Sequence, residues 1–325
     1  MKNPDGRDAQ ELRLTLDPAT RRGAKIKVIG VGGAGGNAVD HMIRNGVAGV
    51  EFIAANTDAQ ALSRTQAKNQ IQLGSTGLGA GAKPEAGRAA ALEARDQIAD
   101  ALRGAHMAFI TAGMGGGTGT GAAPIVAEVA KQMGILTVAV VTKPFSFEGV
   151  RRTQAAQAGI DDLSQHVDSV IVILNEKLEE VLGDDVSMED AFSSADSVLK
   201  NAVAGISEII NVPGLINVDF QDVRTVMAEQ GMAMMGSAAA SGVDRARIAA
   251  EQAVACPLLE GVNLSGARGV VVNITANKSS LKLRDTKEVM KTNRGILADD
   301  ATIIFGAVYA YALSAERPVP ALQNG

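Results

Sequence analysis

The chain has few of the residues that mark secreted and metal-binding proteins. Among its 325 residues there is one cysteine, Cys256, and there is no tryptophan. A single cysteine cannot form an intramolecular disulfide or a cysteine-based zinc site. This shortage of cysteine favours a reducing, cytoplasmic setting.

Long apolar runs and basic clusters are also missing. The N-terminal segment Met1–Arg22 is polar, and no stretch reaches the roughly 18 to 20 apolar residues that span a bilayer. The net charge is −5, and adjacent arginines occur only at 21–22 and 151–152. We therefore expect no secretion, no direct membrane insertion and no nucleic-acid partner.

Apolar residues make up 46% of the chain, which is typical of a globular protein. From Lys25 onward, short apolar runs alternate with helical patterns, and several runs are continuously apolar, as in strands that are covered on both faces. This order predicts an α/β fold with a mostly parallel sheet. The expected strands are 26–31, 51–56, 70–73, 107–112, 136–142 and 169–174, with helices at 84–103 and 122–133.

A long helical pattern then interrupts the alternation. Ser187 and Asp190 suit a capping box, and apolar residues recur every three or four positions as far as Ile210. Such a helix would be about 35 Å long and could join two domains. The segment 316–320 carries two prolines and is a poor candidate for an interior strand. Between the long helix and the segment 316–320 we expect helices at 222–235, 245–255 and 286–297 and strands at 269–275 and 302–309.

Glycine is enriched, with 36 residues or about 11% against an average of roughly 7%. Gly30, Gly32 and Gly35 follow the first strand and match the dinucleotide-binding pattern GxGxxG. Asp58 lies past the next strand, where an acid that binds ribose would lie. Taken alone, this loop favours NAD or FAD, and a simple tight turn is the alternative.

A second loop, Gly113–Gly121, has six glycines in nine residues and also lies between a strand and a helix. Its backbone N–H groups can converge on an anion at a helix N-terminus, and Thr118 and Thr120 add hydroxyls. Two such loops in one sheet suggest a polyphosphate that is held from both sides. The Walker pattern GxxxxGK[ST] is absent.

The run Gly-Gly-Gly-Thr-Gly-Thr-Gly at 115–121 is similar to the signature of the tubulin/FtsZ GTPase family. The resemblance extends from about Lys25 to Tyr309 and includes the segments 142–149, 217–222 and 264–269. It implies a tubulin-like fold, in which a Rossmann-type parallel-sheet GTPase domain is joined by a long central helix to a smaller α+β domain. The implied division is a flexible arm (1–24), a GTP-binding domain (25–186), the central helix (187–210), a C-terminal activation domain (211–314) and a short tail (315–325).

The resemblance also implies GTP or GDP as the ligand. Phe192 and Asp196 lie four residues apart on one helix face, where a ring could stack on guanine and a carboxylate could accept from guanine N1–H and N2–H₂. Without the resemblance, Glu148 and Arg152 would be a solvated helix start and Asn175 a turn former. The positions that match nucleotide contacts are Gly33, Ala34, Gly35, Gly36, Asn37, Gly115, Gly116, Gly117, Thr118, Gly119, Thr120, Gly121, Glu148, Arg152, Asn175, Phe192 and Asp196.

Asn217, Asp219 and Asp222 match the catalytic loop of the family. In the family this loop enters the nucleotide site of the next subunit, where the two acids polarise the attacking water. Asp219 is also a good helix N-cap with Asp222 in the first turn, and both roles are compatible. Mg²⁺ is implied by the charge of the polyphosphate, and we assign no protein side chain to it.

The implied function is a GTPase that polymerises head to tail with itself in the cytoplasm, at the division site. An open alternative is a low-activity GTP-binding partner that co-assembles with a full-length FtsZ, for example in a magnetosome-linked role. A dinucleotide oxidoreductase is a more distant third. FtsZ chains commonly continue into a final strand, a linker and a peptide that binds membrane anchors, and 315–325 resembles neither the strand nor the peptide. The short C-terminus has two explanations, a truncated sequence or a naturally shortened paralogue without that anchor peptide, and we favour the second.

Overall fold

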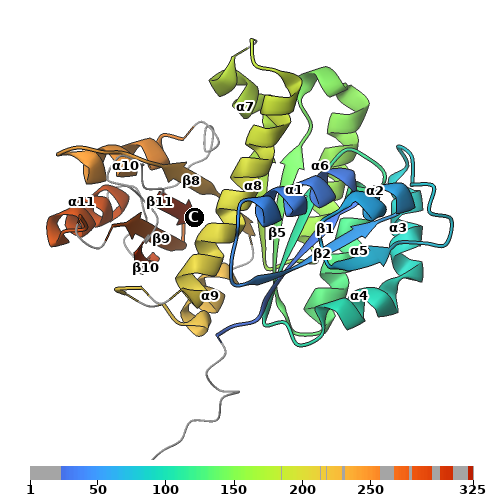
Figure 1. Cartoon of the computed structure of the whole chain (residues 1–325), viewed down its shortest axis with the longest axis horizontal. Coiled ribbons are helices and arrows are strands. Elements are labelled where there is room, and N and C mark those ends of the chain that lie inside the picture. The colour runs from blue at the N-terminus through green and yellow to red at the C-terminus, as the bar shows by residue number, and fades with distance from the viewer. Residues whose placement is uncertain are drawn as a thin grey trace, which may run out of the picture.

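Two units lie on either side of one long helix, α8 (Met188–Asn211), in the computed structural model of the chain (Figure 1). The structure describes residues 23–183, 185–212, 214–216, 218–228, 231–256, 267–277, 280–294, 301–309 and 321–324. Among these residues, no helix is both long and apolar enough to cross a membrane.

The larger unit is built on a seven-stranded sheet in the order β3-β2-β1-β4-β5-β6-β7, and every neighbouring pair is parallel. The first six strands confirm the predicted runs to within one residue at each end. The seventh strand follows α8 in the chain and was not predicted. The bounds are β1 (Ile26–Val31), β2 (Val50–Asn56), β3 (Asn69–Gln72), β4 (Met107–Gly113), β5 (Leu136–Lys143), β6 (Ser169–Leu174) and β7 (Gly231–Ala233).

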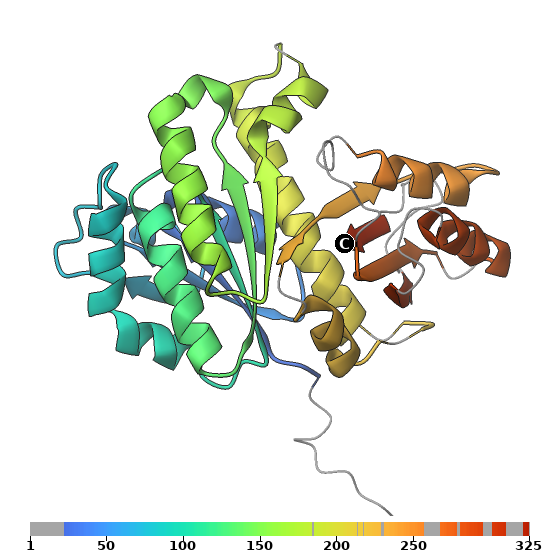
Figure 2. The ribbon, with the colours of Figure 1, turned by 180° about the vertical axis from the view of Figure 1, so that it is seen from behind.

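Helices cover both faces of this sheet, which explains why its central strands are continuously apolar. Val28 and Val138 point to the face covered by α1 and α8 (Figure 1), and Ile29 and Val141 point to the opposite face, seen in Figure 2. The predicted helix at 84–103 is split at Ala94 into two helices. The bounds are α1 (Gly32–Arg44), α2 (Ala59–Arg64), α3 (Pro84–Glu93), α4 (Arg95–Leu102), α5 (Thr118–Gln132), α6 (Val150–Ser164) and α7 (Asn175–Leu182).

The smaller unit carries a four-stranded sheet in the order β10-β9-β11-β8. Strands β9 and β10 are parallel, and β11 is antiparallel to both of its neighbours. This is the α+β unit that the resemblance implies. The bounds are α9 (Phe220–Met227), β8 (Met235–Ala238), α10 (Arg245–Val254), β9 (Gly269–Ala276), α11 (Leu283–Arg294), β10 (Thr302–Tyr309) and β11 (Ala321–Asn324).

The predicted helix at 222–235 is wrong over its second half. Helix α9 ends at Met227, and the chain then forms β7 and β8. Strand β7 pairs with β6 of the first sheet, and β8 pairs with β11 of the second. Pairing with these distant strands overrides the local preference of alanine and methionine for helix.

The expectation that the segment 315–325 supplies no final strand is wrong. Strand β11 lies between β9 and β8. Residues 316–320 lie outside the described part of the chain, and both prolines, Pro318 and Pro320, precede Ala321 in the sequence. They therefore occupy no position of β11, so the proline rule did not apply to it.

Replacing two glycines of the glycine loops would test how closely these helices pack. A Cβ on Gly121 of α5 would collide with the carbonyl oxygen of Pro84 at the start of α3, whereas a Cβ on Gly36 of α1 would meet nothing within 4 Å. We expect Gly121→Ala to lower the free energy of unfolding by roughly 1–3 kcal/mol. The matched variant Gly36→Ala should leave it unchanged or raise it by up to about 1 kcal/mol. Chemical denaturation of the nucleotide-free variants measures both, and equal effects would contradict this packing.

Candidate functional site

A cavity of about 400 Å³ opens beside the carboxyl ends of β1 and β4. These strands are neighbours at the point where the strand order reverses, which is the usual place for a ligand in an open parallel sheet. Helix α1 begins at Gly32 and helix α5 at Thr118, both at this edge. Because two helix N-termini face the same space, it favours an anion.

The glycine loops pack against one another to form one wall of the cavity. Gly32 has φ +76°, and a Cβ there would lie 2.9 Å from the backbone nitrogen of Gly119. The hydroxyls of Thr57 and Thr118 are hydrogen-bonded at 2.6 Å. A Cβ on Gly117 would collide with the carbonyl oxygen of Gly81. Glycine at these positions therefore lets the loops approach one another more closely than side chains would allow.

The opposite side of the cavity is lined by α8 and by the start of α7. Phe192 of α8 contacts Phe145 edge to face, with ring centroids 5.2 Å apart. Asn175 is only 4% exposed, and its Oδ1 has no hydrogen-bond partner among the described residues. A buried acceptor without a donor is costly, so this oxygen fits a ligand that brings an N–H group.

Asp196 lies one turn beyond Phe192 on the same helix and also lines the cavity. Burial raises the pKa of its carboxyl to about 6, and the positive charge of Arg44 on α1 partly opposes this rise in pKa. Glu148 and Arg152 line the cavity as an ion pair with an N–O distance of 2.7 Å. Arg152 lies in the first turn of α6, Glu148 ends the short 3-10 turn before that helix, and both residues line the cavity.

The structure brings together most of the predicted nucleotide positions, and five of them stand apart from the cavity lining. Thr120 is buried, and its Oγ1 accepts a hydrogen bond from the Gly115 backbone N–H at 2.8 Å. A Cβ on Gly35 would collide with the Thr111 carbonyl oxygen. These residues shape the loops from behind. The predicted positions in the lining are Gly33, Ala34, Asn37, Gly116, Gly117, Thr118, Gly119, Glu148, Arg152, Asn175, Phe192 and Asp196, and those outside it are Gly35, Gly36, Gly115, Thr120 and Gly121.

Several lining residues were not predicted as contacts. Asn56 and Thr142 lie at the carboxyl ends of β2 and β5, and the segment Gly79–Gly81 precedes α3. Two signals in the sequence could have found them: the ends of parallel strands share one edge of the sheet, and a third glycine cluster precedes Pro84 at a helix start. Asp58 lines the cavity and also caps α2, since its side chain accepts from the backbone of Gln60 and Ala61.

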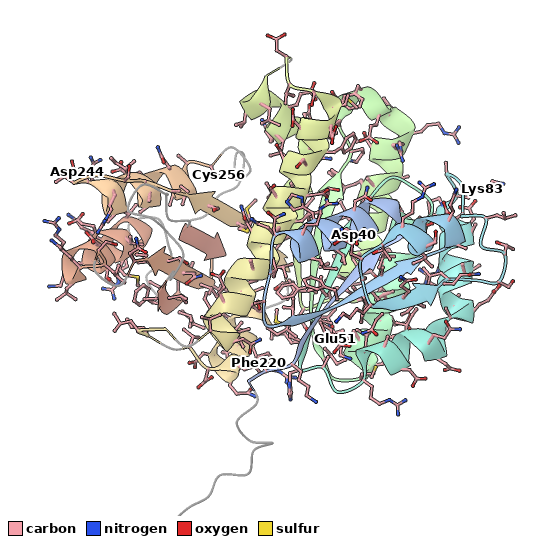
Figure 3. The ribbon with its side chains drawn as sticks, in the orientation of Figure 1. Asp40, Glu51, Lys83, Phe220, Asp244 and Cys256 are labelled. Atoms are coloured by element: carbon pink, nitrogen blue, oxygen red, sulfur yellow. The ribbon has the colours of Figure 1, made fainter. Side chains whose placement is uncertain are left out.

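The acid pair lies at the other end of the sheet. Asp219 caps α9, and its Oδ1 accepts from the Asp222 backbone N–H at 2.9 Å, which confirms the predicted N-cap. Phe220, between them, contacts His106 with ring centroids 6.0 Å apart. His106 directly precedes β4, whose seven residues span about 20 Å to the cavity. Figure 3 shows Phe220 near the lower end of the molecule, and Asn217 lies outside the described residues.

A Rossmann-type sheet with anion-binding loops at one edge and an acid pair at the other defines a nucleotide-binding protein whose two sites do not meet within one chain. Residues 25–183 match the model of the tubulin/FtsZ family GTPase domain, and residues 231–322 match that of the FtsZ family C-terminal domain. The chain belongs to the tubulin/FtsZ family.

Curated relatives are similar in sequence to this chain along most of its length. It is 57% identical over 288 residues to the cell division protein FtsZ of Neisseria meningitidis, which covers 87% of this chain and 73% of that protein. It is 58% identical over 305 residues to the FtsZ of Pseudomonas aeruginosa, covering 93% and 77%. These matches do not support the dinucleotide oxidoreductase that the first glycine loop alone suggested.

Solved structures show the same fold. An empty FtsZ dimer from M. jannaschii superposes with a TM-score of 0.87 at 42% identity, covering 95% of this chain and 92% of that one. CetZ1 from Haloferax volcanii, at 19% identity, shares the fold with a TM-score of 0.80. The chain is therefore a tubulin-like GTPase that forms filaments in cell division, and the low-activity alternative is not favoured.

The raised pKa of Asp196 predicts how nucleotide affinity depends on pH. The free carboxyl gains a proton as the pH falls below about 6, and a protonated carboxyl cannot accept from both guanine donors. Affinity for GDP should therefore be full above pH 7 and weaken by about tenfold per pH unit below pH 6.

Titration of fluorescent GDP between pH 5 and pH 8 measures this dependence. Asp196→Asn is the control, because it removes the titrating group and leaves the titration of the phosphates. A wild-type profile parallel to that of Asp196→Asn would contradict the assignment.

Proposed function

We propose that GTP binds in this cavity with its phosphates at the N-termini of α1 and α5 and its guanine against α8. The observation that carries this proposal is the orphaned buried Oδ1 of Asn175, which lines the same cavity as the Asp196 carboxyl. Guanine presents N1–H and N2–H₂ donors to such acceptors, and adenine presents none at that edge. Phe192 supplies a ring for stacking.

We propose Mg²⁺ as the companion ion. The described residues contain no group of three histidine, cysteine, aspartate or glutamate side chains that could hold a metal. The hydroxyls of Thr57 and Thr118 at the cavity wall fit an ion that is held mainly by phosphate and water. Bound there, Mg²⁺ would neutralise charge on the phosphates.

Hydrolysis, in this proposal, joins two subunits. Asp219 and Asp222 lie at the amino end of the sheet and the cavity lies at its carboxyl end, so head-to-tail stacking brings the acids of one subunit to the cavity of the next. The Asp222 carboxylate is exposed, and one Asp219 oxygen is used by the helix cap. The remaining carboxylate oxygens are available to orient the attacking water. Asn217 is assigned to the same loop by its resemblance alone.

The cellular setting is also a proposal. We propose that filaments of this chain act at the division site and can include a full-length FtsZ subunit, because 57% identity to such relatives favours a shared interface. We further propose the domain division 25–186, 187–210 and 211–314, which is supported by the position of α8 between the two sheets.

Turnover should depend on assembly. GTPase activity per subunit should rise steeply above a threshold protein concentration, in parallel with light scattering. Asp222→Ala should bind GDP like the wild type and hydrolyse GTP at least about 100-fold more slowly. Specific activity that is independent of concentration, or an active Asp222→Ala variant, would contradict hydrolysis between subunits.

Asp196→Asn should also change the base that is selected. Xanthine carries a carbonyl oxygen where guanine carries its N2 amino group, and the amide N–H₂ of asparagine can donate to that oxygen. We expect the variant to lose at least about tenfold in affinity for GDP and to gain affinity for XDP. Competition of both nucleotides for the two proteins measures the change. Equal losses for GDP and XDP would show that residue 196 does not contact the base.

A further inference from the structure

Helix α9, which carries the acid pair, is attached at its first residue to the amino edge of the GTPase sheet. Phe220 is the first helical residue and contacts the His106 ring. The His106 ring is fixed in turn, because its Nδ1 accepts from the Lys25 backbone N–H at 2.8 Å. The backbone of His106 donates to the Lys25 carbonyl and accepts from Leu136, so it is held between the starts of β1 and β5.

The other end of α9 is attached to the same edge by a buried hydrogen bond. Ser169, the first residue of β6, donates its Oγ to the carbonyl oxygen of Met227, the last residue of α9, at 2.7 Å. The carbonyls of a final helical turn lack partners within the helix, and this hydroxyl satisfies one of them. Gly231 of β7 then pairs with Ser169, which fixes the exit of the helix.

The outer side of α9 contacts β9 in the sheet of the smaller unit. Val226 packs so closely on Gly269, the first residue of β9, that a Cβ on that glycine would lie 2.7 Å from a Val226 methyl carbon. The Phe220–His106 and Met227–Ser169 contacts therefore relate the acid pair to the GTPase sheet of its own subunit. In a head-to-tail filament that sheet stands in a fixed relation to the next cavity, so these contacts set where the acids arrive.

We propose that His106 and Ser169 are positioning residues for GTP hydrolysis, which hold α9 so that Asp219 and Asp222 reach the nucleotide of the next subunit. This inference rests on the proposed role of the acid pair. Neither residue touches the cavity, and their effect is on the geometry of the loop alone. A displacement of catalytic groups by about 1 Å is enough to reduce turnover by orders of magnitude.

The test measures turnover per assembled subunit in His106→Ala and Ser169→Ala. We expect kcat to fall at least about fivefold in each, with KM for GTP and affinity for GDP within about twofold of the wild type. Because His106 is exposed, its replacement should leave the unfolding temperature nearly unchanged. Sedimentation with a slowly hydrolysed GTP analogue confirms that equal amounts of filament are compared.

Matched variants separate positioning from a general loss of structure. His106→Phe keeps a ring against Phe220 but loses the Nδ1 acceptor for the Lys25 N–H, so it should restore kcat only part of the way to the wild-type value. His166→Ala removes another histidine, whose Nε2 lies 3.5 Å from an Asp162 carboxylate oxygen. Thr137→Val removes a buried hydroxyl that donates to the carbonyl oxygen of Ile135, the residue just before β5. Both controls should keep wild-type turnover.

Asp222→Ala makes the outcomes distinguishable. If it retains activity, the role of the acid pair is wrong. If it is inactive while His106→Ala and Ser169→Ala both turn over like the wild type, the acids act but these two residues do not position them. A fall in kcat for His106→Phe equal to that for His106→Ala would also overturn the role of the ring contact.

Discussion

The parallel direction of every strand pair in the larger sheet is the constraint on which the rest of this structure depends. It gathers the carboxyl ends of the strands, and with them the N-termini of α1 and α5, at one edge. Glycine at Gly32 and Gly117 then lets three loops close into one wall. Anion binding at that edge is thus a consequence of strand direction, since helix dipoles and free N–H groups converge there. The same constraint leaves the amino edge of the sheet without such groups, and that edge receives α9 instead.

Helix α8 connects these two edges. Phe192 and Asp196 lie near its beginning and line the cavity, and Asn211 ends it about 22 Å further along. In the proposed binding mode, a single chain holds the nucleotide at one end and the acid pair at the other, and small movements cannot bring them together. In the proposed mechanism, assembly supplies the missing contact. In this account the coupling of GTP hydrolysis to filament formation follows from the geometry of one subunit.

Much of this arrangement could be predicted from the sequence. Continuous apolar runs gave six strands to within one residue, because strands buried on both faces leave a strong local signal. The glycine loops also left a local signal, because clustered glycines between a strand and a helix are typical of an anion site. Strands β7 and β11 were missed, since each is short and is specified by its partners in the sheet. The sequence could not predict that Thr120 and Gly121 lie outside the cavity lining, because their positions depend on how α5 packs against α3 and α6. Ser169 is an unremarkable strand residue until its contact with Met227 is seen.

The central claim is that the acids of one subunit act on the nucleotide of another, and a mixture of two variants tests it most directly. Asp222→Ala has an intact cavity and a defective acid loop, whereas Asp196→Asn has an intact loop and a cavity directed to xanthine. With GTP labelled at its γ-phosphate and unlabelled XTP present, neither variant alone should release labelled phosphate. The account predicts that the equimolar mixture releases it, because GTP bound to Asp222→Ala then faces the loop of an Asp196→Asn neighbour. A mixture that co-sediments into filaments and releases no labelled phosphate would contradict it.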